Sequence, residues 1–288
     1  IKRENEEHEI DPEDIDFGDP IGQGAQGEVF KVKYDGDVCA GKVIRTGGMT
    51  VPQQNALYES FRKEFALMCS IRTPRIVQVY GAVTGIPGKL VMVMEYASQG
   101  SLRALLDKQD VPLPKEMALG LVFDVACGMK ALYAQGIHHR DLKAANVLLD
   151  EKFRGKVCDF GLSKAEALQT HVSSLGASVG TLAWQSPEEL DDEDEDDEKC
   201  DVFSFGVTVW EILTGDLPWK GLKPSKIIAK VLTGKRLHAD EALANAYGDQ
   251  CVGLMKACWA QDPGDRPRFA EIVHDCASFQ WEGIGASR

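Results

Sequence analysis

The sequence lacks any long uninterrupted run of apolar residues. None approaches the roughly 18 residues of a membrane-spanning helix, so we expect no membrane segment in this part of the protein. A signal-peptide pattern is also missing at the start. Because the first residue is Ile1, we expect a fragment of a longer protein, whose other parts could set its location or anchor it to a membrane.

Paired cysteines are missing too. The eight cysteines include no Cys-x-x-Cys pair, which argues against a zinc site. Most of them lie inside apolar runs, as buried thiols do. The pattern predicts a reducing, cytoplasmic compartment and no disulfide framework.

Positive charge is scarce. The 32 Lys and Arg residues face 45 Asp and Glu residues, and the formal charge of −13 argues against nucleic-acid binding. Eight consecutive acidic residues, 191–198, supply much of the excess. Because like charges repel, we predict a solvated, mobile loop there; attraction of basic substrates or partners is the alternative.

Two motifs carry the chemistry that is present. His139–Asn146 reads HRDLKAAN, and Asp159–Gly161, which reads DFG, begins thirteen positions after Asn146. Together they supply a carboxylate base for an acceptor hydroxyl, an ammonium group for phosphate oxygens, and two oxygen ligands for a hard divalent metal such as Mg²⁺. The motifs predict phosphoryl transfer.

A glycine-rich loop and a lysine precede these motifs in the expected order. Gly22–Val29 reads GQGAQGEV, and Lys42 follows in an apolar run. A dinucleotide-binding fold, the main alternative, needs a helix directly after the glycines. Instead, residues 28–34 alternate between apolar and charged, and Asp35–Asp37 reads as a hairpin turn. We therefore predict two strands that form a flap over phosphates.

The periodicity divides the chain into a strand-rich and a helix-rich part. We predict three strands in 17–44, strands at 76–83 and 90–96, and a helix over 54–71 with Leu57, Phe61, Phe65, Met68 and Ile71 on one face. Helices follow: one capped by Ser101, one over 115–135, and a buried central one over 201–214.

From Phe17 to about Trp281 the chain resembles the eukaryotic protein kinase catalytic domain. The resemblance implies an α+β, bilobal fold with ATP in the cleft between the lobes. The implied division is an N-terminal tail (1–16), a five-stranded small lobe with one helix (17–97), a larger, mainly helical lobe (98–281) and a C-terminal tail (282–288).

The resemblance also implies catalytic roles. Lys42 would hold the α- and β-phosphates of ATP, with Glu64 as its partner; Glu59 is a poorer alternative by spacing. Asp141 would orient the acceptor hydroxyl and Lys143 would steady the γ-phosphate. Asn146 and Asp159 would ligate Mg²⁺.

The positions implied to bind the nucleotide are Ile21, Gly22, Gly24, Gly27, Val29, Ala40, Lys42, Met94, Glu95, Ala97 and Leu148. Among these, Met94 matches the gatekeeper at the back of the adenine pocket. Glu95 and Ala97 match the hinge, whose backbone groups would bind the adenine edge.

Two positions indicate whether the chain would phosphorylate serine and threonine or tyrosine. Lys143 and Thr181 are similar to those of serine/threonine kinases, whereas Trp184 and the segments 258–263 and 265–269 resemble the tyrosine-kinase-like group. We predict a serine/threonine kinase of that group, acting on protein substrates. The alternatives are a tyrosine or dual-specificity kinase and a pseudokinase scaffold.

Regulatory and structural pairs follow from the same resemblance. Arg140 would bind a phosphorylated activation segment, for which Ser174 and Ser178 are the leading sites, and self-association could serve autophosphorylation. Glu188 and Arg266 would form an ion pair. Four positions depart from the usual kinase pattern, none of them in the phosphate or metal chemistry: Gly41, Thr73, Ser186 and Phe203.

Overall fold

The computed structural model describes residues 8–24, 27–47, 50, 52–54, 65, 68–160, 181–191 and 196–279. They form two compact units, one up to Ser98 and one from Gln99 onward, and each is considered by itself. No helix among the described residues is both long enough and apolar enough to span a bilayer.

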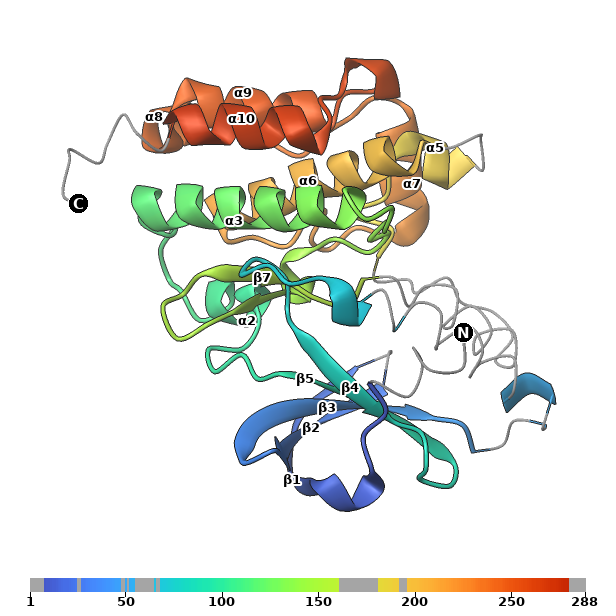
Figure 1. Cartoon of the computed structure of the whole chain (residues 1–288). Helices are drawn as coiled ribbons and strands as arrows, with labels where there is room; N and C mark the ends of the chain where they lie inside the picture. The colour runs from blue at the N-terminus through green and yellow to red at the C-terminus, as the bar shows by residue number, and fades with distance from the viewer. Residues whose placement is uncertain are drawn as a thin grey trace. The chain divides into compact units, whose positions relative to one another are not determined.

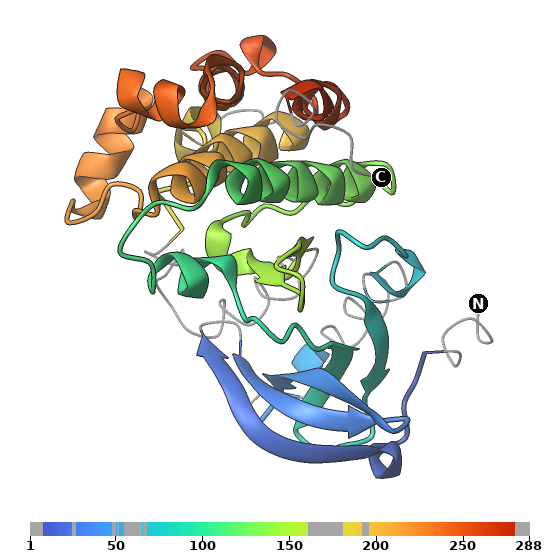
Figure 2. The same cartoon turned by 90° about the vertical axis from the view of Figure 1, so that its left-hand side faces the viewer.

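The first unit is built on a five-stranded antiparallel sheet in the order β1-β2-β3-β5-β4 (Figure 1). Its strands are β1 (Ile15–Gly24), β2 (Gly27–Tyr34), β3 (Asp37–Arg45), β4 (Val79–Val83) and β5 (Lys89–Glu95). The five predicted strands are confirmed. Figure 2 shows the curvature of the blue strands of this sheet.

The β2–β3 turn is the predicted one. Tyr34 pairs with Asp37, and the two residues between them, Asp35 and Gly36, have φ values of 51° and 83°. Two consecutive residues with positive φ match the right-handed twist of the flanking strands, which is why Asp-Gly is favoured there.

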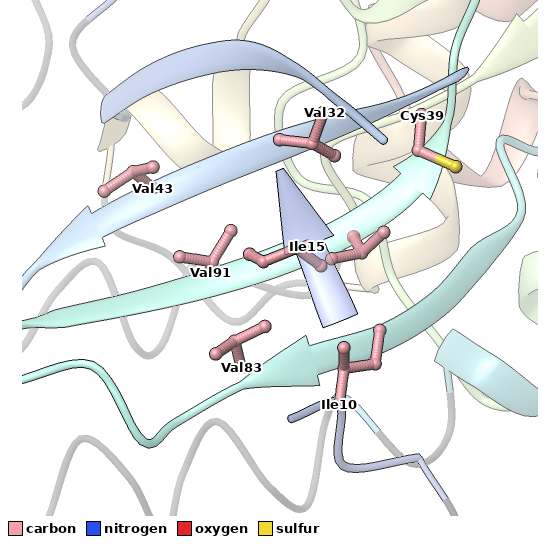
Figure 3. Packing of buried hydrophobic residues seen from close by; sticks show 8 residues of the cluster. Ile10, Ile15, Val32, Cys39, Val43, Val83 and Val91 are labelled. Carbon is pink, nitrogen blue, oxygen red and sulfur yellow. The ribbon is translucent and has the colours of Figure 1, made fainter. Parts of the chain in front are cut away.

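One face of the sheet carries a hydrophobic core of small branched side chains (Figure 3). Val32, Val43 and Val91 contribute to it from three adjacent strands, and each is at most 2% exposed. Alternation along the strands places these side chains on the same face. Ile10, which precedes the first strand, also belongs to this cluster.

Residues 8–12 form an integral part of the sheet edge, which corrects the predicted tail up to residue 16. Ile10 N donates to Ala82 O (2.8 Å) and Ala82 N donates to His8 O (3.0 Å), a parallel bridge to the edge strand β4. The Glu9 carboxylate accepts hydrogen bonds from Thr84 N and Thr84 Oγ1. Ile10 and Ile15, both within the predicted tail, are buried in the core of this sheet.

The second unit is mainly helical, as predicted. Its α-helices are α2 (Leu102–Leu106), α3 (Lys115–Tyr133), α5 (Pro187–Asp191), α6 (Asp197–Thr214), α7 (Pro224–Leu232), α8 (Glu241–Tyr247), α9 (Asp249–Cys258) and α10 (Phe269–Phe279). A short hairpin joins β6 (Val147–Leu149) to β7 (Gly155–Val157). The expected serine cap is present, because Ser101 Oγ accepts from Ala104 N (3.2 Å).

Helix α6 is the central helix of this unit, between α3 and α9 in Figure 1. Its residues from Cys200 to Leu213 are all buried, which confirms the prediction for 201–214. It ends at Gly215, whose φ of 76° and N–H bond to Glu211 O form a left-handed cap.

The two ends of the acidic run, Asp191 and residues 196–198, belong to helices or cap one. The prediction of a loop is therefore wrong at these positions. Asp191 ends α5, Asp196 caps α6 by accepting from Glu198 N, and Asp197 and Glu198 form the first turn of α6. Acidic groups at a helix N-terminus interact favourably with its dipole. Residues 192–195 lie outside the described residues.

The predicted helix over 54–71 lies mostly outside the described residues. Residues 54, 65 and 68–70 are helical, and Phe65, Met68 and Ile71 of the predicted apolar stripe are buried. Leu57 and Phe61 are not described.

Replacing Gly81 with Ala is expected to displace residues 8–12 from β4. A Cβ at Gly81 would lie 2.8 Å from His8 O and would overlap the Ile10 side chain. Such overpacking typically costs about 1–3 kcal/mol of unfolding free energy. Chemical denaturation and limited proteolysis around residue 10 would measure it. Gly120→Ala in α3 is the control, since no atom lies within 4 Å of its Cβ position. Equal stability and equal proteolysis of Gly81→Ala and the unmodified chain would contradict the expectation.

Candidate active site

Lys42 lies in the middle of β3 and is 3% exposed. It pairs with Val29 on β2 and with Met92 on β5, so its backbone is fixed from both sides. A buried ammonium group needs a charged or polar partner, and lysines are seldom buried without one. Glu64, the predicted partner, lies outside the described residues.

The other predicted nucleotide-binding positions of this unit gather on adjacent strands. Ala40 pairs with Met94, and both are buried. Cys39 pairs with Glu95, and Glu95 N donates to Gln78 O (2.8 Å), which anchors the start of the predicted hinge. Ala97, two residues on, is half-buried.

The glycine-rich segment includes the end of β1 and the start of β2. Gly22 pairs with Val29 and Gly24 pairs with Gly27 across the hairpin. This is the predicted strand-loop-strand arrangement, and it excludes the helix that a dinucleotide-binding fold requires. Ile21, near the end of β1, is 43% exposed.

In the second unit, two polar side chains of the HRDLKAAN motif, those of Lys143 and Asn146, both contact Asp141. Lys143 Nζ donates to Asp141 Oδ1 (2.8 Å). Asn146 Nδ2 donates to Asp141 O (2.7 Å) and to Asp141 Oδ2 (2.9 Å). Both oxygens of the Asp141 carboxylate therefore accept hydrogen bonds. Because the Asn146 amide nitrogen donates to Asp141, the amide oxygen is the atom of this side chain that could ligate a metal.

The β6–β7 hairpin brings the two predicted metal ligands to the same end. Val147 pairs with Val157, and Cys158 N donates to Asn146 O (3.0 Å) just beyond that pair. Asp159 follows directly. Leu148, a predicted nucleotide-binding residue, lies in β6 and is half-buried.

The donor set fits a metal that also uses substrate oxygens. Within the described ranges, no group of three or more His, Cys, Asp or Glu side chains could hold a metal ion. One carboxylate and one amide oxygen suit Mg²⁺, which is usually held by one or two protein ligands plus substrate phosphates.

Thr181 contacts the same loop. Lys143 Nζ donates to Thr181 Oγ1 (3.3 Å), so this ammonium group bridges the Asp141 carboxylate and the threonine hydroxyl.

Sequence reasoning gave no role to Asp201, the buried anchor of the loop. Its Oδ2 accepts from His139 N (2.7 Å) and its Oδ1 accepts from Arg140 N (2.7 Å). Arg140 has a φ of 62°, a strained conformation for a non-glycine residue, and these two bonds hold it. Burial raises the pKa of the Asp201 carboxyl, an effect that these hydrogen bonds and the one from Tyr133 oppose. A carboxylate at the start of the otherwise largely apolar stretch 201–214 was the available signal.

The predicted Glu188–Arg266 ion pair is present. Arg266 Nη1 and Nη2 donate to Glu188 Oε1 (2.5 Å) and Oε2 (2.9 Å). The Arg266 guanidinium also lies 5.2 Å from the centre of the Phe203 ring, so the Phe that departs from the usual Trp still supplies an aromatic face for a cation.

The serine that departs from the usual alanine also has a structural role. Ser186 N donates to Glu189 Oε2 (2.8 Å), and Ser186 Oγ accepts from Glu189 N (3.4 Å). This reciprocal pair is a capping box at the start of α5.

Of the predicted regulatory residues, Ser174 and Ser178 lie outside the described residues. Arg140 pairs with the acidic run: its Nη2 lies 2.9 Å from Asp197 Oδ1. His138 Nδ1 lies 2.6 Å from the other oxygen of the same carboxylate.

The first unit has a buried lysine, Lys42, in the strand that follows the glycine-rich hairpin. The second unit has Asp141, Lys143, Asn146 and Asp159. Together these features define a phosphoryl-transfer domain of the protein kinase class. Known proteins agree. The family of protein tyrosine and serine/threonine kinases matches residues 15–276.

Individual relatives cover nearly the whole chain. Serine/threonine-protein kinase CTR1 of Arabidopsis thaliana is 39% identical over 90% of this chain and 31% of its own length. Putative serine/threonine-protein kinase/receptor R831 of Acanthamoeba polyphaga mimivirus is 35% identical over 93% of this chain and 16% of its own length. Serine/threonine/tyrosine-protein kinase HT1 of Arabidopsis thaliana is 33% identical over 94% of this chain and 68% of its own length.

The chain belongs to the protein tyrosine and serine/threonine kinase family. This confirms the predicted kinase domain and its α+β fold. It also makes ATP the expected phosphoryl donor and a divalent metal the usual cofactor. The chain spans less than a third of the length of CTR1 and of R831.

Proposed function

We propose that this chain is the catalytic domain of a serine/threonine kinase, which transfers the γ-phosphate of ATP to hydroxyl groups of protein substrates. The observation that carries the proposal is the contact of Lys143 with both Asp141 and Thr181. In this contact, the Lys143 ammonium group donates to both the Asp141 carboxylate and the Thr181 hydroxyl group. Membership of the kinase family and the names of the relatives, serine/threonine-protein kinases, support the proposal.

The first unit binds the nucleotide in this proposal. Lys42 binds the α- and β-phosphates, with Glu64 as its partner, and the backbone of the glycine-rich hairpin covers the phosphates. Backbone groups of Glu95 and Ala97 bind adenine, and Met94 limits the depth of the pocket. The burial of Lys42 and its fixed place in β3 support this assignment.

The second unit performs the transfer. Asp141 accepts the hydrogen bond of the substrate hydroxyl and takes its proton, as that oxygen bonds to the γ-phosphorus and the bond to the β-phosphate oxygen breaks. Lys143 stabilises the charge on the transferred group. Asn146 and Asp159 would hold Mg²⁺, which would supply charge neutralisation at the phosphates.

The acceptor class is tested by labelling. The domain is incubated with γ-labelled ATP, Mg²⁺ and a generic basic protein, and the labelled protein is hydrolysed for phosphoamino-acid analysis. We expect label in phosphoserine and phosphothreonine, because Lys143 and Thr181 match serine/threonine kinases. Additional label in phosphotyrosine would favour dual specificity. This is the second candidate, because the relative HT1 is named a serine/threonine/tyrosine-protein kinase. A reaction without Mg²⁺ and with a chelator is the control, and label confined to phosphotyrosine would contradict the proposal.

Regulation is proposed to act through Arg140. A phosphate on Ser174 or Ser178 would bring about two negative charges. Because Asp197 already pairs with Arg140, the phosphate would have to share or displace that carboxylate. Self-association for autophosphorylation belongs to the same proposal.

A reducing location such as the cytoplasm is also proposed. None of the eight cysteines forms a disulfide bond. Burial raises the pKa of six of the thiols, which keeps them protonated and unreactive: Cys39, Cys69, Cys200, Cys251, Cys258 and Cys276.

A further inference from the structure

Six of the 32 Lys and Arg residues of this acidic chain fall within residues 220–236, which contain no Asp or Glu. Helix α7 runs through the middle of this stretch. The formal charge is +6 for the stretch and −13 for the chain, so the remaining residues carry −19. The five lysines of the stretch are all exposed: Lys220, Lys223, Lys226, Lys230 and Lys235.

These lysines have no acidic partner in the part of the chain that the structure describes. No ion pair joins any of them to a carboxylate there. The last residues of the acidic run, 196–198, pair instead with His138, Arg140 and Arg268. Within the described residues, the positive charge around α7 therefore remains uncompensated.

The dipole of α7 does not account for the lysines at the start of this helix. Positive charge is stabilised at the C-terminal end of a helix, where Lys230 lies, and is disfavoured at the N-terminal end. Lys223 is the N-cap residue and provides no side-chain cap. Lys226 lies in the first turn, which has no acidic residue. The helix itself therefore gains no stability from these two cations.

A cavity of about 360 Å³ lies just past the C-terminal end of α7. Arg236 and Lys256 line it, and none of its lining residues is acidic. Arg236 is held by neutral acceptors, since it donates to Trp259 O (2.6 Å) and to Gln261 Oε1 (2.7 Å). Burial lowers the pKa of Arg236 to about 10, and the charge of Arg266 adds to this effect. Two cations without a carboxylate make the cavity suited to an anionic group.

Helix α7 is connected to the proposed acceptor site through α5. The two helices pack against each other (Figure 1). Helix α5 begins at Pro187, shortly after the turn that contains Thr181, and Thr181 contacts Lys143. A protein bound along α7 would thus keep its own hydroxyl groups close to Asp141, at a raised effective concentration.

We propose that this lysine surface binds an acidic segment of a protein substrate. The surface consists of Lys220, Lys223, Lys226, Lys230 and Lys235, together with Arg236 and Lys256. One carboxylate of the segment occupies the cavity that Arg236 and Lys256 line, and others pair with the exposed lysines. The inference rests on the proposed function, because it takes the bound protein to be a substrate.

A short acidic segment fits this surface better than a nucleic acid or an anionic membrane does. Both of these are extended, so they would also approach the rest of the chain, whose net charge is −19. Charges interact over about 8 Å at physiological ionic strength, so a peptide confined to the lysines avoids most of this repulsion.

Reversing the charge of the first three lysines tests the proposal. The variant Lys220→Glu/Lys223→Glu/Lys226→Glu should not unfold α7, because acidic residues are favourable at a helix N-terminus. The ligand is a peptide with a serine acceptor and a glutamate-rich tail, labelled for fluorescence anisotropy. We expect its Kd to rise about 10-fold. With the unmodified domain, the Kd should also rise with ionic strength.

The matched control is Lys108→Glu/Lys115→Glu/Lys152→Glu. It makes the same change in net charge at exposed lysines of the same unit, one of which also begins a helix. Its Kd should stay within about twofold of the unmodified domain, because these sites are remote from α7. Lys256→Gln tests the cavity and should raise the Kd about threefold. A peptide with glutamine in place of glutamate should bind equally weakly to every variant.

Steady-state kinetics connect binding to transfer. Reversal of the three lysines should raise KM for the acidic peptide about 10-fold and leave kcat nearly unchanged, because docking acts equally on the bound state and the transition state. Equal Kd for the two triple variants would overturn the proposal. Tighter lysine-dependent binding of a single-stranded oligonucleotide, or of vesicles that contain phosphatidylserine, would also overturn it. If the proposed function fails, the unmodified domain labels no acceptor, while lysine-dependent binding of the peptide persists.

Discussion

Replacing Asp141 with Asn is expected to lower kcat by about 10²- to 10⁴-fold, the range typical of a lost general base. The carboxylate accepts from Lys143 Nζ (2.8 Å) on one oxygen and from Asn146 Nδ2 (2.9 Å) on the other. The amide nitrogen of an asparagine is itself a donor, so it would face Lys143 Nζ or Asn146 Nδ2 without forming a hydrogen bond. The amide also could not take a proton. The loop would thus lose the proposed base and one of the two hydrogen bonds that the Asp141 side chain accepts.

The measurement is the initial rate of peptide phosphorylation at saturating ATP, together with ATP affinity by calorimetry. ATP affinity should stay within about threefold, because the phosphate contacts proposed for Lys42 are untouched. Asp150→Asn is the matched control in the same segment. Asp150 only accepts turn bonds from Lys152 N (2.8 Å) and Arg154 N (2.9 Å), which an Asn can also accept. A kcat within twofold of the unmodified domain for Asp141→Asn would remove the assignment of the base.

The largest loss of stability is expected for Arg266→Met. Removing one partner of a buried ion pair typically costs about 3–5 kcal/mol, because the other charge stays buried without compensation. Here Glu188 would lose both guanidinium bonds. The carbonyl groups of Ala260 and Lys199 would lose a donor as well. Chemical denaturation would measure the difference in unfolding free energy.

Arg268→Met is the control for this change. Its side chain is 53% exposed and pairs with Asp196 and Glu198 at the surface, where such pairs contribute about 0–1 kcal/mol. A loss for Arg266→Met no larger than that for Arg268→Met would show that the buried pair does not stabilise the fold as described.

The same pair gives a pH dependence with a definite sign. Burial tends to raise the pKa of the Glu188 carboxyl, but the hydrogen bonds and charge of Arg266 prevail and lower it. The stabilisation is therefore present above the unfolded-state pKa of about 4.3 and is lost as the pH falls through the lower folded-state pKa. In Arg266→Met this part of the acid dependence should disappear, which makes its stability curve flatter below about pH 5.

Sequence patterns predicted most of the fold because local signals and tertiary structure agree in this chain. Alternation in residues 28–34 and the Asp35–Gly36 turn predicted the hairpin. The almost entirely apolar stretch over 201–214 predicted a buried helix. Short motifs with fixed spacing predicted Asp141, Lys143 and Asn146, whose mutual contacts span only a few residues.

Long-range polar contacts could not be predicted in this way. Asp201 and Glu211 bond to residues about 60 positions earlier, and no periodicity indicates such a partner. The acidic run was misjudged for a related reason. Repulsion between neighbours argued for a loop. Instead, the N-terminus of α6 and the side chains of His138, Arg140 and Arg268 accommodate its last three charges.

The bridge between residues 8–10 and β4 bears on where this domain can be cut. Strand β4 is at the edge of its sheet, and His8–Ile10 cover its outward hydrogen-bonding groups. A fragment trimmed to residue 15, where the family match begins, would expose that backbone together with the hollow left by Ile10. Uncovered strand edges pair readily with other chains. The boundary suggested by homology alone would therefore yield a domain prone to aggregate.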